Sequence, residues 1–123
     1  MVKVSHMVLP VTDPSKSRDW YVNNLGFELE FEREDVTAVK DAAGLTIFLQ
    51  KSAGSSAAEK ITLTIQVKDV DAKYRQLSND GVIFDSAPKR QFWGYGAEVI
   101  DPDGYVNHLW DEVTMREMTK EPK

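Results

Sequence analysis

The feature that most constrains the fold is an internal repeat, in which the second half of the chain reproduces the order of segments in the first. Asp13 corresponds to Asp69, and Gly26 to Gly81, at offsets of 56 and 55 residues. In each half the aspartate precedes an expected helix and the glycine ends it, and an Asp-to-Gly turn recurs before the last strand. This agreement of element order, caps and turns indicates two copies of one supersecondary unit. The sequence therefore predicts an α+β fold of two tandem βαβββ modules.

Hydrophobic periodicity and turn residues set the boundaries of these modules. Module 1 is expected at about 1–51 and module 2 at about 60–112, within one domain spanning 1–123. The segment 52–59 is rich in serine and alanine and reads as a flexible linker. The polar tail at 113–123 is expected to form one helical turn or two. The expected strands are 2–11, 27–33, 36–40, 45–51, 61–67, 82–85, 95–100 and 105–110.

The charge balance and the missing cysteine narrow the classes of partner. Lysine and arginine number 15 against 20 aspartates and glutamates, and the net charge of −5 disfavours nucleic acid, because phosphate contacts need clustered cations. The chain has no cysteine, which excludes disulfides and thiolate catalysis and suits a reducing compartment. No apolar run approaches the roughly 18 residues of a membrane span, and no long apolar stretch of a signal peptide opens the chain. We therefore expect a cytoplasmic protein that binds neither nucleic acid nor membrane.

Strand alternation separates two faces in each expected sheet. One face is apolar and is expected to pack on the helices, whereas the other is polar without being charged, which suits the lining of a ligand groove. Both histidines of the chain, His6 and His108, fall on the second face. Aromatic side chains on this face can stack on planar ligands. Together with the two histidines, the expected ligand-binding residues are Phe48, Gln50, Thr62, Thr64, Trp93 (at the rim) and Trp110.

Several motifs are weak alone but specific in their order and spacing. They are His6–Asp13, Trp20–Tyr21 running into Leu25–Phe27, and the turn Asp101–Gly104. With these motifs the chain, to about residue 112, resembles the vicinal oxygen chelate superfamily of glyoxalase I, extradiol dioxygenases, fosfomycin-resistance enzymes and bleomycin-resistance proteins. Gln91–Gly94, followed by that turn and His108, is most similar to the bleomycin-resistance proteins. The resemblance implies paired βαβββ modules whose mixed sheets curve around a groove, usually in a homodimer.

The resemblance also implies where metal-dependent members of the superfamily take their ligands. Those positions hold His6, Phe48, Thr62 and His108 in this chain. Phenylalanine cannot ligate a metal and threonine is a poor ligand, whereas a catalytic divalent site usually takes three or more good protein ligands. We therefore expect no metal, no other cofactor and no catalytic residue, with a divalent ion held by His6 and His108 as the alternative.

Two functions of different classes are consistent with these residues. The first is a non-catalytic protein that binds and sequesters a small antibiotic-like molecule in a groove between two chains of a homodimer. The aromatic side chains favour an aromatic ligand, and the net negative charge favours one that is neutral or cationic. The second is a metal-dependent lyase, isomerase or dioxygenase that holds its ion through His6, His108 and an unidentified third ligand. Phe48 and Thr62, which hold two of the metal-ligand positions, favour the first function. Whether the protein is an enzyme is left open.

Overall fold

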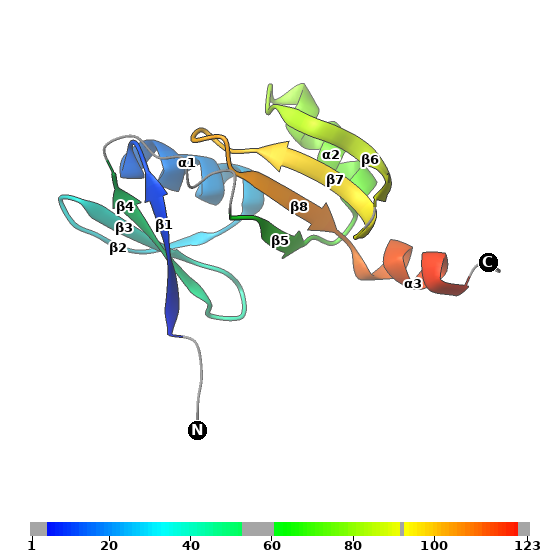
Figure 1. Ribbon diagram of the computed structural model, residues 1–123, viewed down its shortest axis with the longest axis horizontal. Coiled ribbons are helices and arrows are strands. Elements are labelled where there is room, and N and C mark those ends of the chain that lie inside the picture. The colour runs from blue at the N-terminus through cyan, green and yellow to red at the C-terminus, as the bar shows by residue number, and fades with distance from the viewer. Residues whose placement is uncertain (1–4, 53–60, 92, 121–123) are drawn as a thin grey trace. The chain divides into compact units, whose positions relative to one another are not determined.

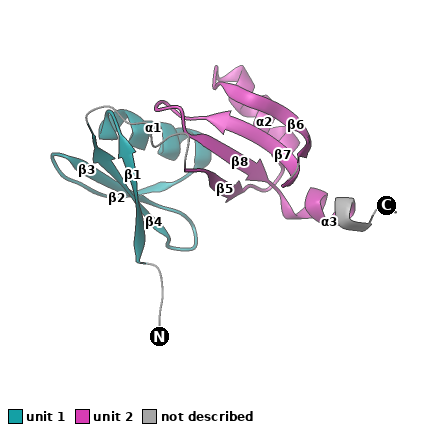
Figure 2. Ribbon diagram, in the orientation of Figure 1, with its two compact units in different colours: residues 1–57 teal, residues 58–123 magenta. Residues whose placement is uncertain are grey.

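The computed structural model describes residues 5–52, 61–91 and 93–120, with side chains through 117. Contacts within the chain divide it into two units, Met1–Ala57 and Ala58–Lys123 (Figure 2). The boundary between the units falls in the expected linker at 52–59, of which residues 53–59 lie outside the described residues. Each unit is described by itself below.

Unit 1 has the expected order of one strand, one helix and three strands. It forms one four-stranded sheet in which the first strand is parallel to the last and the other neighbours are antiparallel. The elements are β1 (His6–Val11), α1 (Pro14–Leu25), β2 (Glu28–Glu32), β3 (Val36–Lys40) and β4 (Thr46–Lys51), with the strand order β1-β4-β3-β2 (Figure 1).

Unit 2 repeats this order and adds a third helix. Its elements are β5 (Leu63–Gln66), α2 (Val70–Asn79), β6 (Phe84–Gln91), β7 (Gly94–Ile100), β8 (Val106–Trp110) and α3 (Glu112–Lys120) (Figure 1). The strand order β5-β8-β7-β6 matches that of unit 1, again with only the first and last strands of the module parallel. The predicted α+β fold with two βαβββ modules and mixed sheets is confirmed.

Capping residues explain where the helices begin and end. Asp13 accepts hydrogen bonds from two backbone N–H groups in the first turn of α1, at 3.0 and 3.2 Å. Pro14 occupies the first helical position, and Gly26, with φ at +79° in the left-handed region, ends the helix. Asp69 caps α2 by accepting a hydrogen bond of 3.0 Å from the N–H of Ala72. The aspartates that signalled the repeat therefore act as helix caps in both units.

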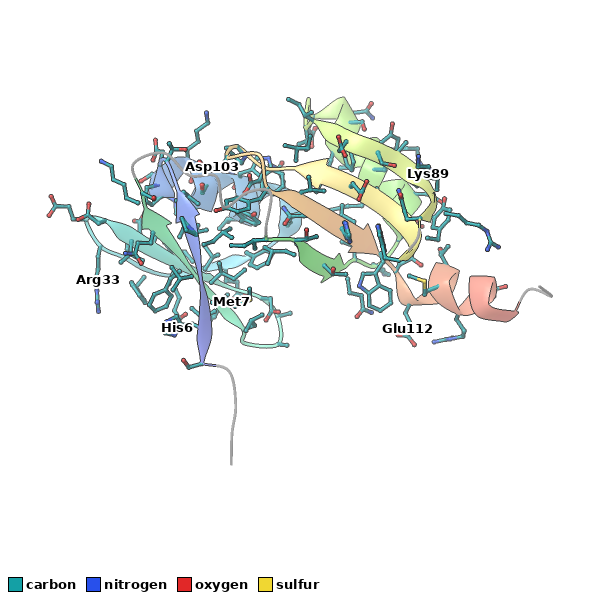
Figure 3. The ribbon with its side chains drawn as sticks, in the orientation of Figure 1. His6, Met7, Arg33, Lys89, Asp103 and Glu112 are labelled. Carbon is teal, nitrogen blue, oxygen red and sulfur yellow. The ribbon has the colours of Figure 1, made fainter. Side chains whose placement is uncertain are left out.

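Two elements are longer than the sequence predicted. The strand expected at 82–85 runs from Phe84 to Gln91 and includes Lys89 (Figure 3). It forms an edge of its sheet, where Pro88 is tolerated because an edge strand does not need every N–H donor. The polar tail forms the nine-residue helix α3, whose first turn is capped by Asp111 through a 2.6 Å hydrogen bond from the N–H of Thr114.

The core of each unit lies between the apolar face of its sheet and its first helix. Contacts join α1 to β3 and β4 in unit 1, and α2 to β6 and β7 in unit 2. Fully buried side chains at this layer include Leu9, Val11, Tyr21, Val39 and Leu49 in unit 1 and Val70, Leu77, Val99 and Leu109 in unit 2. Alternate strand positions face the other way. No helix in the described ranges has the length and hydrophobicity that a membrane crossing requires.

Candidate functional site

The eight predicted ligand-binding residues divide between the two units. Unit 1 holds His6, Phe48 and Gln50, and unit 2 holds Thr62, Thr64, Trp93, His108 and Trp110. Each histidine lies on the predicted face of its own sheet, opposite the buried apolar residues. That both histidines line one groove stays a prediction, because they belong to different units.

Unit 1 carries an aromatic row formed by His6, Phe48, Phe31 and Arg33. The imidazole of His6 stacks on the ring of Phe48, with centroids 4.0 Å apart and an angle of 15° between the planes. Phe31 of β2 meets Phe48 edge-on, with centroids 5.4 Å apart. The guanidinium carbon of Arg33 lies 4.8 Å from the centre of the Phe31 ring, and Figure 3 labels both His6 and Arg33. The row presents aromatic surface bounded by a cation at one end.

Polar side chains adjoin the aromatic row on the same face of the sheet. Gln50 is exposed and lies two residues beyond Phe48, so both side chains point to one side of β4. Thr46 is buried at the other end of that strand, and its hydroxyl donates a 2.8 Å hydrogen bond to the carboxylate of Glu30. Thr46 is therefore engaged within the protein, whereas the exposed Gln50 side chain is available to a ligand.

Unit 2 carries a polar row, formed by Thr64, His108 and Glu98, that crosses three strands. In the sheet register, His108 of β8 stands between Thr64 of β5 and Glu98 of β7. Nε2 of His108 lies 3.1 Å from Oε2 of Glu98, and the two side chains are 14% and 19% exposed. Pairing offsets the cost of removing either group from water. Glu98 is therefore a member of this site that is not among the eight predicted ligand-binding residues.

Trp93 covers one face of the His108 imidazole. The two rings are stacked, with centroids 4.2 Å apart and an angle of 7° between their planes. The indole also lies over Gly96, where an added Cβ would be 2.5 Å from Cη2 of the indole. The indole N–H is buried and has no acceptor within the described residues. The structure thus brings Trp93 and His108 together, although the sequence placed Trp93 only at the rim of the site.

Three further predicted residues lie near this stacked pair in unit 2. Trp110 is half-buried and follows His108 by two residues, so its indole lies on the same face of β8. Thr64 is exposed beside His108, and Thr62 is exposed just before β5 begins. This face of unit 2 therefore combines two indoles, an imidazole–carboxylate pair and an exposed hydroxyl.

The pKa shifts in unit 2 belong to groups that hold its helices. The Tyr95 hydroxyl donates a 2.8 Å hydrogen bond to Asp71 of α2, and burial, followed by this bond, raises the pKa of Tyr95. Burial would raise the pKa of Asp111, but hydrogen bonds from Val70 and Thr114 to its carboxylate outweigh burial and lower that pKa. These residues are separate from the polar row and stabilise the positions of α2 and α3.

The residues described in either unit do not make up a complete metal site. No group of three or more histidine, aspartate or glutamate side chains is placed to hold an ion within those residues. His108 and Glu98 offer two potential ligands, while Thr62 is a poor ligand. In unit 1, Phe48 lies against His6 and cannot ligate a metal. The expected absence of a metal and of other cofactors stays a prediction.

Comparisons with known proteins cover nearly the whole chain. Residues 3–109 match the family model of the glyoxalase/bleomycin resistance protein/dioxygenase superfamily. The structure is similar to that of TnmS3, an antibiotic binding protein from Streptomyces sp. CB03234, with 28% identity, a TM-score of 0.75, and 90% of this chain and 96% of that chain covered. It shares its fold with the bleomycin-binding protein of Streptomyces verticillus, at 22% identity and a TM-score of 0.71, with 90% of this chain and 98% of that chain covered. An uncharacterized protein of Shewanella frigidimarina is 27% identical, with 88% of this chain and 90% of that protein covered.

Proposed function

This chain belongs to the glyoxalase/bleomycin resistance protein/dioxygenase superfamily, and we propose that it binds and sequesters a small organic molecule without transforming it. The ligand has a planar aromatic part and is neutral or cationic. The observation that carries the proposal is the stacked Trp93–His108 pair on the polar face of unit 2. The aromatic row of unit 1 supplies a second surface of the same kind.

The aromatic side chains of the site support a ligand with a planar aromatic part. Indole rings have large faces that hold planar molecules by stacking, and both Trp93 and Trp110 lie on the polar face of unit 2. The neighbouring Thr64 and the His108–Glu98 pair can fix a ligand's orientation through hydrogen bonds. A planar molecule with a few polar substituents matches this combination.

The negative charge of the protein supports a ligand that is neutral or cationic. The chain has a net charge of −5, and the polar row contains the carboxylate of Glu98. Both repel polyanions and attract cations. The likeness to TnmS3, which is described as an antibiotic binding protein, supports an antibiotic-like molecule as the ligand.

The residues at the superfamily's metal-ligand positions support a role without catalysis. The resemblance puts the metal ligands of this superfamily at four positions, and Phe48 and Thr62, which hold two of them, are not good ligands. The alternative, a metal-dependent lyase, isomerase or dioxygenase, is not favoured by a specific observation in the described residues. The cytoplasmic location expected from the cysteine-free sequence stays a prediction.

Tryptophan fluorescence tests the proposed function directly. Bleomycin-like glycopeptides and planar aromatic metabolites are titrated against the protein, and a ligand that stacks on Trp93 or Trp110 should quench the indole emission. Trp110→Ala should weaken the best binder tenfold or more, because loss of an aromatic anchor typically costs about 2 kcal/mol and about 1.4 kcal/mol is a factor of ten. Trp20→Phe is the matched control, since Trp20 lies on α1 against Tyr21 in unit 1.

Each possible result bears on a particular step of the proposal. Unchanged affinity in Trp110→Ala would show that Trp110, at the end of β8, is not part of the binding surface. Binding of small polyanions alone would contradict the charge argument. Turnover of a bound ligand in the presence of a divalent ion would replace sequestration by the enzymatic alternative.

A further inference from the structure

The surroundings of His108 leave one edge of its imidazole for a ligand. Trp93 covers a face of the ring at 4.2 Å, and Glu98 occupies the Nε2 edge at 3.1 Å. The other ring nitrogen, Nδ1, has no hydrogen-bond partner within the described residues, and it is not among the polar atoms that packing seals from solvent there. Thr64, the neighbour of His108 on β5, is exposed. Nδ1 is therefore a polar atom of this site that has no partner among the described residues and that, unlike the buried indole N–H of Trp93, is open to a ligand.

The carboxylate of Glu98 determines what Nδ1 can bind. An ionised carboxylate only accepts hydrogen bonds, so the Nε2 of His108 carries the proton that faces it. In a neutral imidazole Nδ1 is then an acceptor, and in a protonated imidazole it becomes a donor. A hydroxyl group satisfies both states, because it can donate to the first and accept from the second. A methyl ether can only accept.

We infer that the ligand carries a hydroxyl on its planar aromatic part, and that this hydroxyl binds Nδ1 of His108. The inference rests on the proposed function and deepens it by naming the ligand class, hydroxylated aromatic compounds. Glu98 is a positioning residue in this site, because it acts on the ligand through the tautomer and orientation of His108. Trp93 holds the same ring from its face.

The test compares planar aromatic probes in matched pairs that differ only in the hydroxyl. Naphthol is paired with methoxynaphthalene, and hydroxyquinoline with methoxyquinoline, and affinities are measured by equilibrium dialysis on the full chain. All the measurements are made at one pH, near 8. We expect each hydroxyl compound to bind about tenfold more tightly than its ether, because only the hydroxyl can donate to Nδ1.

Variants at His108 and Glu98 test which residue causes the preference for the hydroxyl compound. His108→Phe keeps a flat ring against Trp93 but has no Nδ1, so the preference for the hydroxyl compound should disappear. Glu98→Gln lets the amide donate to Nε2 as well as accept from it, so the preference should decrease. Gln76→Ala, on an exposed position of α2, should retain the full preference. If His108→Phe alone does not fold, adding Glu98→Leu removes the unpaired carboxylate and permits the same measurement.

Nitrogen NMR gives a readout that a purely structural role of Glu98 would not move. The chain has 2 histidines, so histidine-labelled protein with His6→Gln contains a single imidazole to observe. In its neutral form, Nε2 should carry the proton and Nδ1 should not. Naphthol should shift the Nδ1 resonance strongly and methoxynaphthalene should not, and Glu98→Gln should mix the two tautomers.

Two results would overturn the inference and remain distinguishable from failure of the proposed function. Equal affinity within each pair, with both members quenching tryptophan, overturns the hydroxyl inference while the binding function stands. Failure of every pair to bind also overturns it. The glycopeptide titration of wild-type and Trp110→Ala protein then decides the binding function separately.

Discussion

Gly96 is the residue on which the Trp93–His108 stack depends. A Cβ added at Gly96 would lie 2.1 Å from the carbonyl oxygen of Leu109, as well as 2.5 Å from the indole of Trp93. A side chain can move away from such a contact, but a carbonyl oxygen held in the β7–β8 pairing cannot move without breaking the sheet. The absence of a side chain at Gly96 lets the indole approach the sheet this closely.

Gly96→Ala is therefore expected to be strongly destabilising. Overpacking against fixed backbone typically costs about 1–3 kcal/mol, and the 2.1 Å contact places this substitution at the upper end of that range. The change in unfolding free energy is measured by urea denaturation of wild type and variant. Near-ultraviolet circular dichroism should show loss of the Trp93 signal in the same variant.

Gly44→Ala provides the matched control for that substitution. Gly44 has nothing within 4 Å of an added Cβ, but its φ of +94° makes any side chain strained. That strain should cost only about 1–2 kcal/mol. Gly96 does not have a positive φ, so if Gly96→Ala lost no more stability than Gly44→Ala, the close contact at Gly96 would not have the expected cost.

At the scale of secondary-structure elements, Asp111 ties two helices of unit 2 to the end of β8. Its carboxylate accepts a 2.7 Å hydrogen bond from the N–H of Val70, which begins α2. It accepts another of 2.6 Å from the N–H of Thr114 in the first turn of α3. The side chain is 2% exposed, so these backbone donors replace the water it has lost. The Asp111 carboxylate therefore accepts a hydrogen bond from a backbone N–H at the start of each of the two helices.

Acid is expected to weaken the fold through Asp111. The hydrogen bonds lower the folded-state pKa of this carboxyl below its ordinary value, although burial acts in the opposite direction. A depressed pKa stabilises the folded state above the unfolded pKa of about 3.9, and this stability is lost as the pH falls through the folded value. The unfolding free energy, measured by urea denaturation from pH 7 to about 2, should fall less steeply in Asp111→Asn than in wild type.

Asp111→Asn should also lower the stability at neutral pH, by about 1 kcal/mol, because its amide has one oxygen and can accept only one of the two backbone hydrogen bonds. Asp80→Asn is the control, because Asp80 is exposed at the end of α2 and its side chain accepts no such backbone bond within the described residues. An acid profile of Asp111→Asn identical to that of wild type would show that other carboxyl groups cause the loss of stability.

At the scale of the whole molecule, each sheet has two strands with a neighbour on one side only. These are β1 and β2 in unit 1, and β5 and β6 in unit 2. Exposed edges pair readily with other strands, and association between two chains is a common way to cover them. The superfamily resemblance implies the same arrangement. The homodimer stays a prediction, based on the sheet edges and on the superfamily resemblance.

We expect the protein to form a homodimer with twice the chain mass of 13.9 kDa. Light scattering coupled to size-exclusion chromatography at micromolar concentration measures this mass. Far-ultraviolet circular dichroism on the same sample checks that the fold is intact. A folded monomer would exclude a binding groove that is formed between two chains.

Divalent ions are expected to leave the melting temperature unchanged. An ion that binds the folded state at a hundredfold excess over its Kd stabilises the protein by about 2.7 kcal/mol, which a thermal scan detects easily. The scan uses Ni²⁺, Zn²⁺ and Mn²⁺ with protein purified without a histidine tag. A rise of several degrees that disappears in both His6→Ala and His108→Ala would instead support the metal-dependent alternative.

The sequence by itself determined the repeat, the helix starts and the division of each sheet into two faces. These features depend on residues close together along the chain: Asp13 and Asp69 cap helices within three residues of themselves, and alternation separates His108 from its buried neighbour Leu109. The His108–Glu98 pair was also within reach of sequence reasoning. The two residues lie equally far from Asp103 in the turn, and equal spacing about a turn predicts cross-strand neighbours.

Only the tertiary structure decided how the site is assembled. The stacking of Trp93 on His108 depends on the path of the chain between β6 and β7 and on the close approach that Gly96 permits, and neither leaves a periodic signal. The length of β6 was likewise set by its pairing with β7 at the edge of the sheet, whereas the start of α3 follows from a local cap by Asp111, the residue just before the helix. Local patterns specify which elements form and which faces they bury, whereas contacts between side chains on different elements depend on register and packing.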